Sequence, residues 1–266
     1  MENNIDDEMI NIFKSLLKLN TSICFISGRG RTSSKEVLLY MYEKLKKSKV
    51  DVKNITCASS NGSIFMYSTQ EFLDTEDSVV EKETLENYIK NKQMLREACI
   101  NNMVKQEGIR GQVDEFIKRS IKSSGSNSLR FPVFSDEIVN EEQLINSLKD
   151  ILLKADLIDE YRIFKGIHKG TNIFEISLVD KLAAVKFLSE KTKIPENLIV
   201  RIGDQGQKYG NDFAMLNSLC GFSVDKVEEE EIGVLPVMGD KGNQVKNVNA
   251  TKKILKQLNF DKDSRE

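Results

Sequence analysis

The sequence predicts an α/β fold in which a parallel sheet lies between helices and a second, α+β unit is inserted into the chain. Three observations predict it: helices and strands alternate at first, the alternation breaks in the middle, and it returns toward the end. With 266 residues, 39% of them hydrophobic, the chain is long and apolar enough to bury such a core.

The first part of the chain reads as helix, strand, helix, strand. Residues 5–19 carry apolar side chains at helical spacing, and TSICFISGRG reads as a short strand ending in small and basic residues. Residues 36–45 form a second amphipathic pattern, and VKNITCASSNGSIFMYS predicts two strands around a turn at Asn61-Gly62. This order is expected of a parallel sheet flanked by helices.

The middle of the chain has a different pattern. Residues 76–106 read as a long charged helix, and the polar spacer KSSGSNS precedes the strand LRFPVFS. A helix over residues 140–157 and the strands EYRIFKGI and TNIFEIS follow. We expect this part to form a separate α+β cap, residues 66–177.

Alternation returns with a helix over residues 180–192, the strand NLIVRIG and a helix over residues 210–219. Two short apolar runs, CGFSVD and GVLPVMG, precede a closing helix over residues 249–258. The core of the predicted fold therefore consists of residues 1–65 and 178–266.

Composition excludes several classes of function. The 39 basic and 41 acidic residues give a net charge of −2, which argues against a nucleic-acid partner held by bulk electrostatics. A single histidine and four scattered cysteines exclude a zinc cluster of the Cys/His kind. No apolar run approaches the roughly 18 residues of a membrane span, and the N-terminus lacks an apolar signal core. We expect a cytoplasmic protein without a membrane partner.

Candidate site residues follow the ends of strands, where open parallel sheets bind their ligands. Ser27 and Gly28 follow the run FIS, and a hydroxyl beside free backbone N–H groups suits a phosphate oxygen. A plain turn with Ser27 as helix N-cap is the alternative. Lys181 opens a helix, where the macrodipole disfavours a cation unless an anion lies nearby; an ordinary surface lysine is the alternative.

The stretch GDQGQKYGND carries the third candidate group. Asp204 ends a strand, a glycine-rich loop follows, and Asn211 and Asp212 begin the next helix. Two carboxylates and an amide can hold Mg²⁺ together with water, although Asp212 could also be a simple N-cap.

Taken together, FISGR, the lysine that opens DKLAAVKF, and GDQGQKYGND resemble the haloacid dehalogenase (HAD) superfamily. Within it the chain is similar to phosphatases with a large α+β (C2-type) cap, in the phosphomannomutase and sugar-phosphatase branch. The turn SSNG resembles the one by which that group enters its cap. The resemblance covers nearly the whole chain and implies a Rossmann-like core.

The resemblance also implies roles for individual residues. Ser27 and Lys181 would bind and neutralise the phosphoryl group, and Asp204 would hold Mg²⁺ with support from Asn211 and Asp212. The residues implied in phosphate or substrate binding are Ser27, Gly28, Arg29, Asn61 and Lys181. Positive charge around the phosphoryl oxygens is what such a transfer needs from the protein.

One motif of the family has no counterpart. Its first strand ends in an Asp-x-Asp-x-Thr-like stretch that supplies the nucleophile and the general acid/base. Here the sequence begins at a helix, and Asp6 and Asp7 are interpreted as N-terminal helix residues that favour the dipole. The absent strand would leave its two neighbours without backbone partners.

Three explanations remain open. Either the true N-terminus lies upstream of Met1, or the protein binds without hydrolysing, or another chain or segment supplies the strand.

Two hypotheses follow. The first is a Mg²⁺-dependent HAD-type phosphohydrolase acting on a small phosphorylated metabolite such as a sugar phosphate, inactive without the nucleophile segment. The second is a non-catalytic HAD-like module that binds a phosphorylated ligand or a protein partner. Arg110 and Arg130 are candidates for holding a second anionic group, with solvated surface arginines as the alternative.

Overall fold

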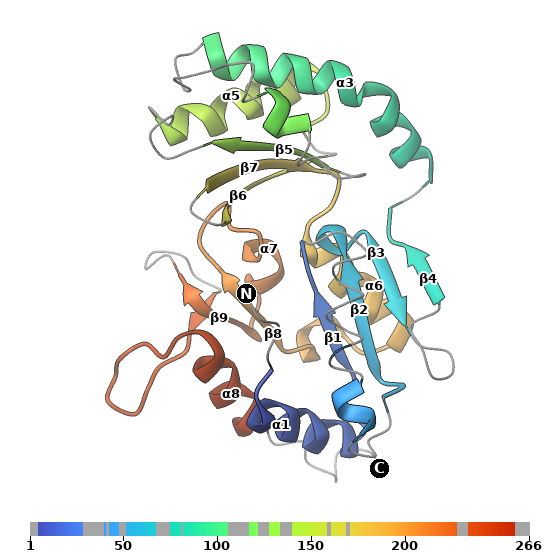
Figure 1. Ribbon diagram of the computed structural model, residues 1–266, viewed down its shortest axis with the longest axis vertical. Coiled ribbons are helices and arrows are strands. Elements are labelled where there is room, and N and C mark those ends of the chain that lie inside the picture. The colour runs from blue at the N-terminus through green and yellow to red at the C-terminus, as the bar shows by residue number, and fades with distance from the viewer. Residues whose placement is uncertain are drawn as a thin grey trace.

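The computed structural model describes residues 5–28, 40, 43–47, 52–67, 75–80, 82–105, 117–121, 128–133, 140–158, 161–168, 171–227 and 234–258. Figure 1 shows two units, one above the other. We call α3, β5, α5, β6 and β7 the upper unit and the remaining elements the lower unit. Among the described residues, the strands form three separate sheets, with the orders β1-β2-β3-β4, β10-β9-β8 and β5-β7-β6.

The first sheet of the lower unit contains β1 (Ile23–Ile26), β2 (Ile55–Ser59), β3 (Ile64–Tyr67) and β4 (Thr75–Ser78). β1 and β2 are parallel, and β3 and β4 continue the sheet antiparallel. Apolar side chains alternate between its two faces. One face packs against α1 (Asp7–Lys18), and the other against α6 (Lys181–Thr192).

The second sheet contains β8 (Arg201–Gln205), β9 (Gly221–Lys226) and β10 (Leu235–Pro236), all parallel. On one face it packs against the short helix α7 (Phe213–Leu216), which in turn packs against α6. On the other face it packs against α8 (Asn247–Gln257). Helices therefore cover both faces of both sheets, which is the three-layer arrangement of an α/β fold.

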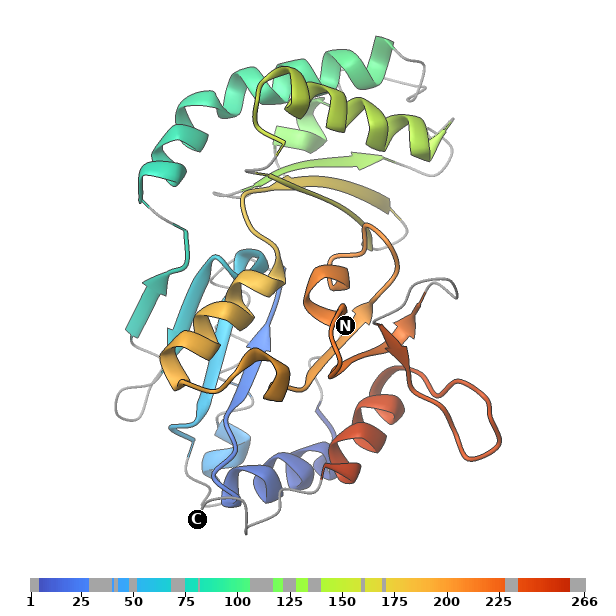
Figure 2. The same cartoon turned by 180° about the vertical axis from the view of Figure 1, so that it is seen from behind.

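The two sheets of the lower unit face each other with open edges. In the described part of the chain, no strand pairs with the second edge of β1 or of β8. Both strands point toward the upper unit (Figures 1 and 2). Every residue of β1 is only half-buried, whereas four of the five residues of β2 are buried. The helices, rather than strand pairing, hold the two sheets together.

The upper unit is an antiparallel sheet under two helices. Its strands are β5 (Ser128–Val133), β6 (Arg162–His168) and β7 (Thr171–Ser177), and β7 lies in the middle. α3 (Lys82–Lys105) and α5 (Glu141–Lys154) cover one face and bury the largest apolar cluster. The other face is turned toward the lower unit (Figure 2).

The structure confirms the predicted fold class and most predicted elements, with three differences at their boundaries. The helix expected over residues 210–219 covers only Phe213–Leu216. Residues 76–78, expected in the long helix, form part of β4, because they pair with β3. The strand expected at residues 197–203 begins only at Arg201, after a 3-10 turn (Glu196–Leu198). The expected helix over residues 36–45 lies mostly outside the described residues. None of the described helices is long and apolar enough to cross a membrane.

Acidic residues at the start of α1 behave as the sequence predicts. Asp6 is the N-cap, and its Oδ1 accepts a hydrogen bond of 2.8 Å from the N–H of Met9. Asp7 lies in the first turn, where a negative charge favours the helix dipole.

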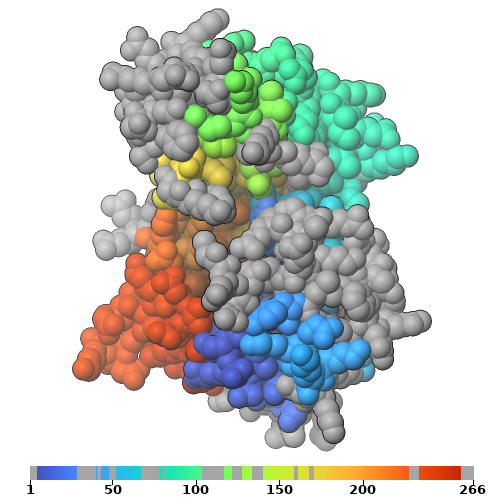
Figure 3. All heavy atoms as spheres, in the orientation of Figure 1, coloured from blue at the N-terminus to red at the C-terminus, as the bar shows by residue number. Residues whose placement is uncertain are grey.

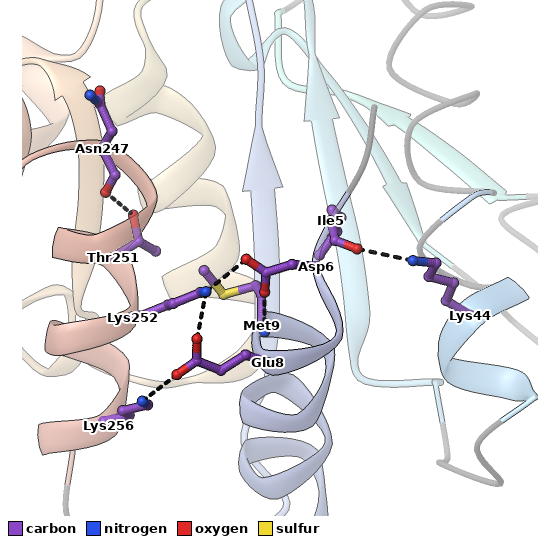
Figure 4. A network of polar contacts seen from close by, with 9 residues as sticks. All are labelled: Ile5, Asp6, Glu8, Met9, Lys44, Asn247, Thr251, Lys252 and Lys256. Carbon is purple, nitrogen blue, oxygen red and sulfur yellow. Dashed lines mark hydrogen bonds and ion pairs between the residues drawn. The ribbon is translucent and has the colours of Figure 1, made fainter. Parts of the chain in front are cut away.

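The same acids connect α1 to α8. The Nζ of Lys252 lies 2.7 Å from Asp6 Oδ2 and 2.6 Å from Glu8 Oε2, and Lys256 binds the other oxygen of Glu8 (Figure 4). The surfaces of the two helices meet in the part of the lower unit that is farthest from the upper unit (Figure 3). Because α1 packs on the first sheet and α8 on the second, this network joins the two halves of the lower unit.

We expect Lys252→Met to lower the thermal unfolding midpoint by roughly 1–3 °C at pH 7 and low salt. The ion pairs hold the pKa values of Asp6 and Glu8 below their ordinary 3.8 and 4.5. Their contribution is therefore complete above pH 4.5 and is lost as the pH falls through the lowered values. Scanning calorimetry at pH 7 and pH 3 measures both effects.

Lys253→Met is the matched control, since Lys253 pairs with Asp240 and not with α1. An equal loss of stability in both variants would contradict the joining role of Lys252. A high salt concentration should reduce the difference between them.

Candidate active site

The candidate residues meet where β1 and β8 end below the upper unit. Gly28 lies between two amide side chains: a Cβ placed on it would be 2.8 Å from Asn61 Oδ1 and 3.0 Å from Asn211 Nδ2. The N–H of Asn61 donates to the carbonyl of Ser27 at 3.1 Å. Segments far apart in the sequence are thus brought together, and a larger residue at Gly28 would have to displace the two amide groups.

Asp212 organises the loop that follows β8. Its Oδ2 accepts hydrogen bonds from the N–H groups of Asp204, at 2.9 Å, and Gln205, at 3.0 Å. Its Oδ1 forms an ion pair with Lys181, and both side chains are buried. The positive charge of Lys181 lowers the pKa of Asp212 despite its burial. Asp212 is therefore a buried carboxylate saturated by protein donors, and not a simple N-cap.

Asp204 has the opposite electrostatics. Partial burial and the neighbouring Asp212 raise the pKa of its carboxyl group from 3.8 to about 6. Ionisation of this carboxyl group is unfavourable in the protein alone. A cation bound nearby would stabilise its charged form. Asn211 offers a second ligand, because its buried Oδ1 accepts no hydrogen bond from the residues that the structure describes.

These two residues fit a hard cation. Mg²⁺ takes oxygen ligands, keeps several waters and binds by one or two carboxylates. In the described residues no group of three or more His, Cys, Asp or Glu side chains could hold a metal.

The upper unit reaches this site through two side chains. Arg130 of β5 donates from Nη2 to the carbonyl of Gly28 at 2.9 Å, and from Nε to Glu175 Oε2 at 2.9 Å. Glu175 of β7 accepts from Asn61 Nδ2 at 2.7 Å through its Oε1. The alternative of a solvated surface arginine is therefore wrong for Arg130. Arg29 and Arg110 lie outside the described residues.

Sequence reasoning did not identify Glu175. Its only signal is one charged residue inside the apolar strand TNIFEIS, on the face opposite to Phe174 and Ile176. A second contact joins the units beside the site: the N–H of Lys165 in β6 donates to the carbonyl of Tyr209 at 2.7 Å.

A cleft lies between the open edges of β1 and β8, with a volume of about 250 Å³. We call it the central cleft. Cys24 and Ile26 line it from β1, Ile202 and Gly203 from β8, and Val185 and Leu188 from α6. Lys181, Asp204 and Asp212 also line it. The cleft therefore leads to the charged residues.

No family model matches the sequence, and no curated protein is significantly similar to it. Solved structures with a similar fold include an N-terminally truncated IMP-nucleotidase of Plasmodium falciparum. It is 18% identical over 95% of this chain and 64% of its own, with a TM-score of 0.60. An IMP-bound mutant of that nucleotidase is 17% identical over 95% of this chain and 62% of its own, with a TM-score of 0.62.

A third structure, TM0651 from Thermotoga maritima, is 17% identical over 97% of this chain and 92% of its own, with a TM-score of 0.52. The chain thus spans less than two thirds of the nucleotidase chains and nearly all of TM0651. At these identities the likeness is one of fold, and it agrees with the predicted α/β class.

We expect Asp204→Asn to stabilise the protein at pH 8 in the presence of a chelator, by on the order of 2–4 °C in unfolding midpoint. The pKa of Asp204 is higher in the folded protein, so the folded state loses stability as the pH rises from 3.8 to about 6. The amide removes this loss, and the gain should disappear near pH 4. Asp150→Asn, at an exposed position of α5, is the control.

Proposed function

We propose that this protein is a Mg²⁺-dependent phosphohydrolase of the HAD type that acts on a small phosphorylated metabolite. The observation that carries the proposal is the meeting of Ser27, Gly28 and Asn61 with Lys181, Asp204 and Asp212 at one edge of the sheets. These are the residues that the resemblance implied, and they come from four separate segments. The shared fold of the nucleotidase and TM0651 supports the same class.

The substrate in this proposal is a phosphate monoester of a sugar or a nucleoside. The sugar phosphate follows from the resemblance to the sugar-phosphatase branch. The nucleoside phosphate is proposed because the chain shares its fold with a protein named IMP-nucleotidase. In both cases the upper unit serves as the cap that covers the bound substrate.

Each side chain has a defined task in this proposal. The hydroxyl of Ser27 and the backbone at Gly28 bind phosphoryl oxygens, and Lys181 offsets their negative charge. Asp212 holds Lys181 in place and shapes the loop that presents Asp204. Asp204 and the Oδ1 of Asn211 would hold Mg²⁺, which when bound supplies positive charge beside the phosphoryl group.

The nucleophile comes from a segment that fills the central cleft. The N–H groups of Ile23 and Ser27 donate to carbonyls on the β2 side, so the alternate groups, on Cys24 and Ile26, point toward the cleft. The N–H of Arg201 donates to the β9 side, so the backbone groups of Ile202 point into the cleft from β8. An extended segment could therefore pair in parallel with both strands.

The chain that precedes α1 is in position to supply this segment. α1 packs on the first sheet while its N-cap, Asp6, binds Lys252 of α8 beside the second sheet (Figure 4). A segment that enters α1 thus emerges between the two sheets, below the cleft. A carboxylate at its far end would reach Lys181 and Asp204. A second chain that carries such a segment is the alternative source.

The intact mass and the composition of the protein purified from its own cells test this part of the proposal. We expect a chain heavier than 30.3 kDa that carries an upstream segment ending in aspartate. A 30.3 kDa chain bound to a second chain would identify a partner as the source. A 30.3 kDa chain alone would contradict the filled cleft and favour the non-catalytic alternative.

Hydrolysis of p-nitrophenyl phosphate with Mg²⁺ tests the activity. We expect little or no turnover from residues 1–266, because the two carboxylates that line the cleft with Lys181 have other tasks: Asp212 pairs with Lys181, and Asp204 would hold Mg²⁺. The chain joined to its upstream segment should be active, and Asp204→Asn or Lys181→Met should reduce kcat about 100-fold or more. Asp150→Asn should leave kcat unchanged.

A joined chain that is inactive on a broad panel of phosphate esters would refute the enzymatic proposal. The second candidate is a module that binds a phosphorylated ligand or a protein without hydrolysis. One observation favours it: both oxygens of Asp212 are engaged by the protein. Titration calorimetry of residues 1–266 with inorganic phosphate and Mg²⁺ measures the binding that both candidates require.

A further inference from the structure

Tyr209, in the loop after β8, is held by the upper unit in three ways. Its carbonyl accepts a hydrogen bond of 2.7 Å from the N–H of Lys165 in β6. Its ring packs against the apolar cluster under α3 and α5. Its hydroxyl accepts a hydrogen bond from Lys149 of α5, whose Nζ also lies 4.7 Å from the ring centroid. A strand, an apolar cluster and a helix of the upper unit thus all bind one side chain of the loop.

The backbone part of this contact uses a sheet edge. β6 is the outer strand in the order β5-β7-β6, and in the described part of the chain no strand pairs with its second edge. Backbone groups at such an edge are available to another segment. Gly210 forms a parallel bridge there with Lys165, in the middle of β6 (Figure 2). The loop is therefore fixed at one position along the strand.

The backbone of Tyr209 is in an unfavourable conformation. Its φ is +60°, in the left-handed region, where the Cβ of a residue with a side chain is crowded. Such a conformation persists where the surrounding structure imposes it. The contacts with Lys165 and Lys149 act on this residue from outside the loop. Without them the backbone of Tyr209 gains by relaxing to a negative φ.

The same loop carries the residues that would hold Mg²⁺. Asp204 lies at its base, and Asn211 follows two residues after Tyr209. Asp212 fixes the base, because its Oδ2 accepts hydrogen bonds from the N–H groups of Asp204 and Gln205. The upper unit fixes the tip through Tyr209. The position of the Asn211 amide relative to the Asp204 carboxylate therefore depends on both contacts.

We propose that Tyr209 is a positioning residue that couples the docking of the upper unit to the binding of Mg²⁺. The inference rests on the proposed function for the Mg²⁺ site. While Tyr209 is docked, the loop keeps the shape that presents Asp204 and Asn211 together. When it leaves the upper unit, its backbone relaxes and displaces Asn211. Coupling of two equilibria is reciprocal, so Mg²⁺ also favours the docked state.

Titration calorimetry of residues 1–266 with Mg²⁺ alone tests the inference without requiring turnover. The decisive variant is Lys149→Met, because Lys149 belongs to the upper unit and binds the loop at Tyr209. We expect it to weaken Mg²⁺ binding about 3- to 10-fold. Lys149→Arg keeps a cation and a donor at the ring and should restore the affinity to within about twofold. Lys154→Met, at an exposed position of the same helix, is the matched control and should change nothing.

Amide hydrogen exchange measures the reverse effect. The N–H of Lys165 is bonded to the carbonyl of Tyr209, so its exchange rate reports how often the upper unit leaves the loop. We expect saturating Mg²⁺ to slow this exchange several-fold in the unsubstituted protein. The N–H of Leu144, which is bonded to the carbonyl of Asn140 at the start of α5, is the control and should not respond. A merely structural role of Tyr209 would give no response to Mg²⁺ at Lys165.

The results separate this inference from the proposed function. Absence of Mg²⁺ binding by the unsubstituted protein would overturn both. Equal Mg²⁺ affinities of Lys149→Met and Lys154→Met, or exchange at Lys165 that ignores Mg²⁺, would overturn the inference alone. If Lys149→Met does not fold, Tyr209→Phe decides, since it removes the hydroxyl and keeps the ring. Weaker Mg²⁺ binding by that variant supports the inference, and an unchanged affinity overturns it.

Discussion

The carboxylate of Asp212 is the interaction on which the site depends. It is 1% exposed, and three donors from the end of β8 and the start of α6 surround it. A buried charge is tolerated only when its partners are in place, so these two elements are fixed relative to each other. Gly203 makes this possible, because a Cβ there would lie 2.7 Å from the carboxyl carbon of Asp212.

The position of α6 then determines how the lower unit is built. α6 packs on the first sheet through Ala184, and through Val185 on α7, which covers the second sheet. It therefore spans the gap that strand pairing leaves open, while α1 and α8 span it on the other side. Two sheets held at a fixed distance by helices keep a cleft between their edges. The Lys181–Asp212 pair thus positions the charged residues and the cleft together.

Local patterns in the sequence predicted the α/β class, the strand ends that carry Ser27 and Asp204, and the helix start at Asp212, because small and polar residues after an apolar run are a short-range signal. The task of Asp212 was not predictable, since a helix N-cap and a buried partner of Lys181 look alike in sequence. The pairing of Arg130 with Glu175 could not be predicted for another reason. Their meeting depends on the register of β5 against β7, which is set by packing under α3 and α5.

The upper unit contacts the lower one at the segments that build the site, including Asn61 after β2. Arg130 binds the carbonyl of Gly28 after β1, and Lys165 binds the carbonyl of Tyr209 after β8. Gly28 in turn lies between the side chains of Asn61 and Asn211. A shift of the loop after β1 would therefore displace a side chain of the loop after β8. The upper unit cannot change its position without exchanging these hydrogen bonds for others. Groups that bind these loops in place of the upper unit must therefore both donate and accept hydrogen bonds, as water and hydroxyl-bearing ligands do.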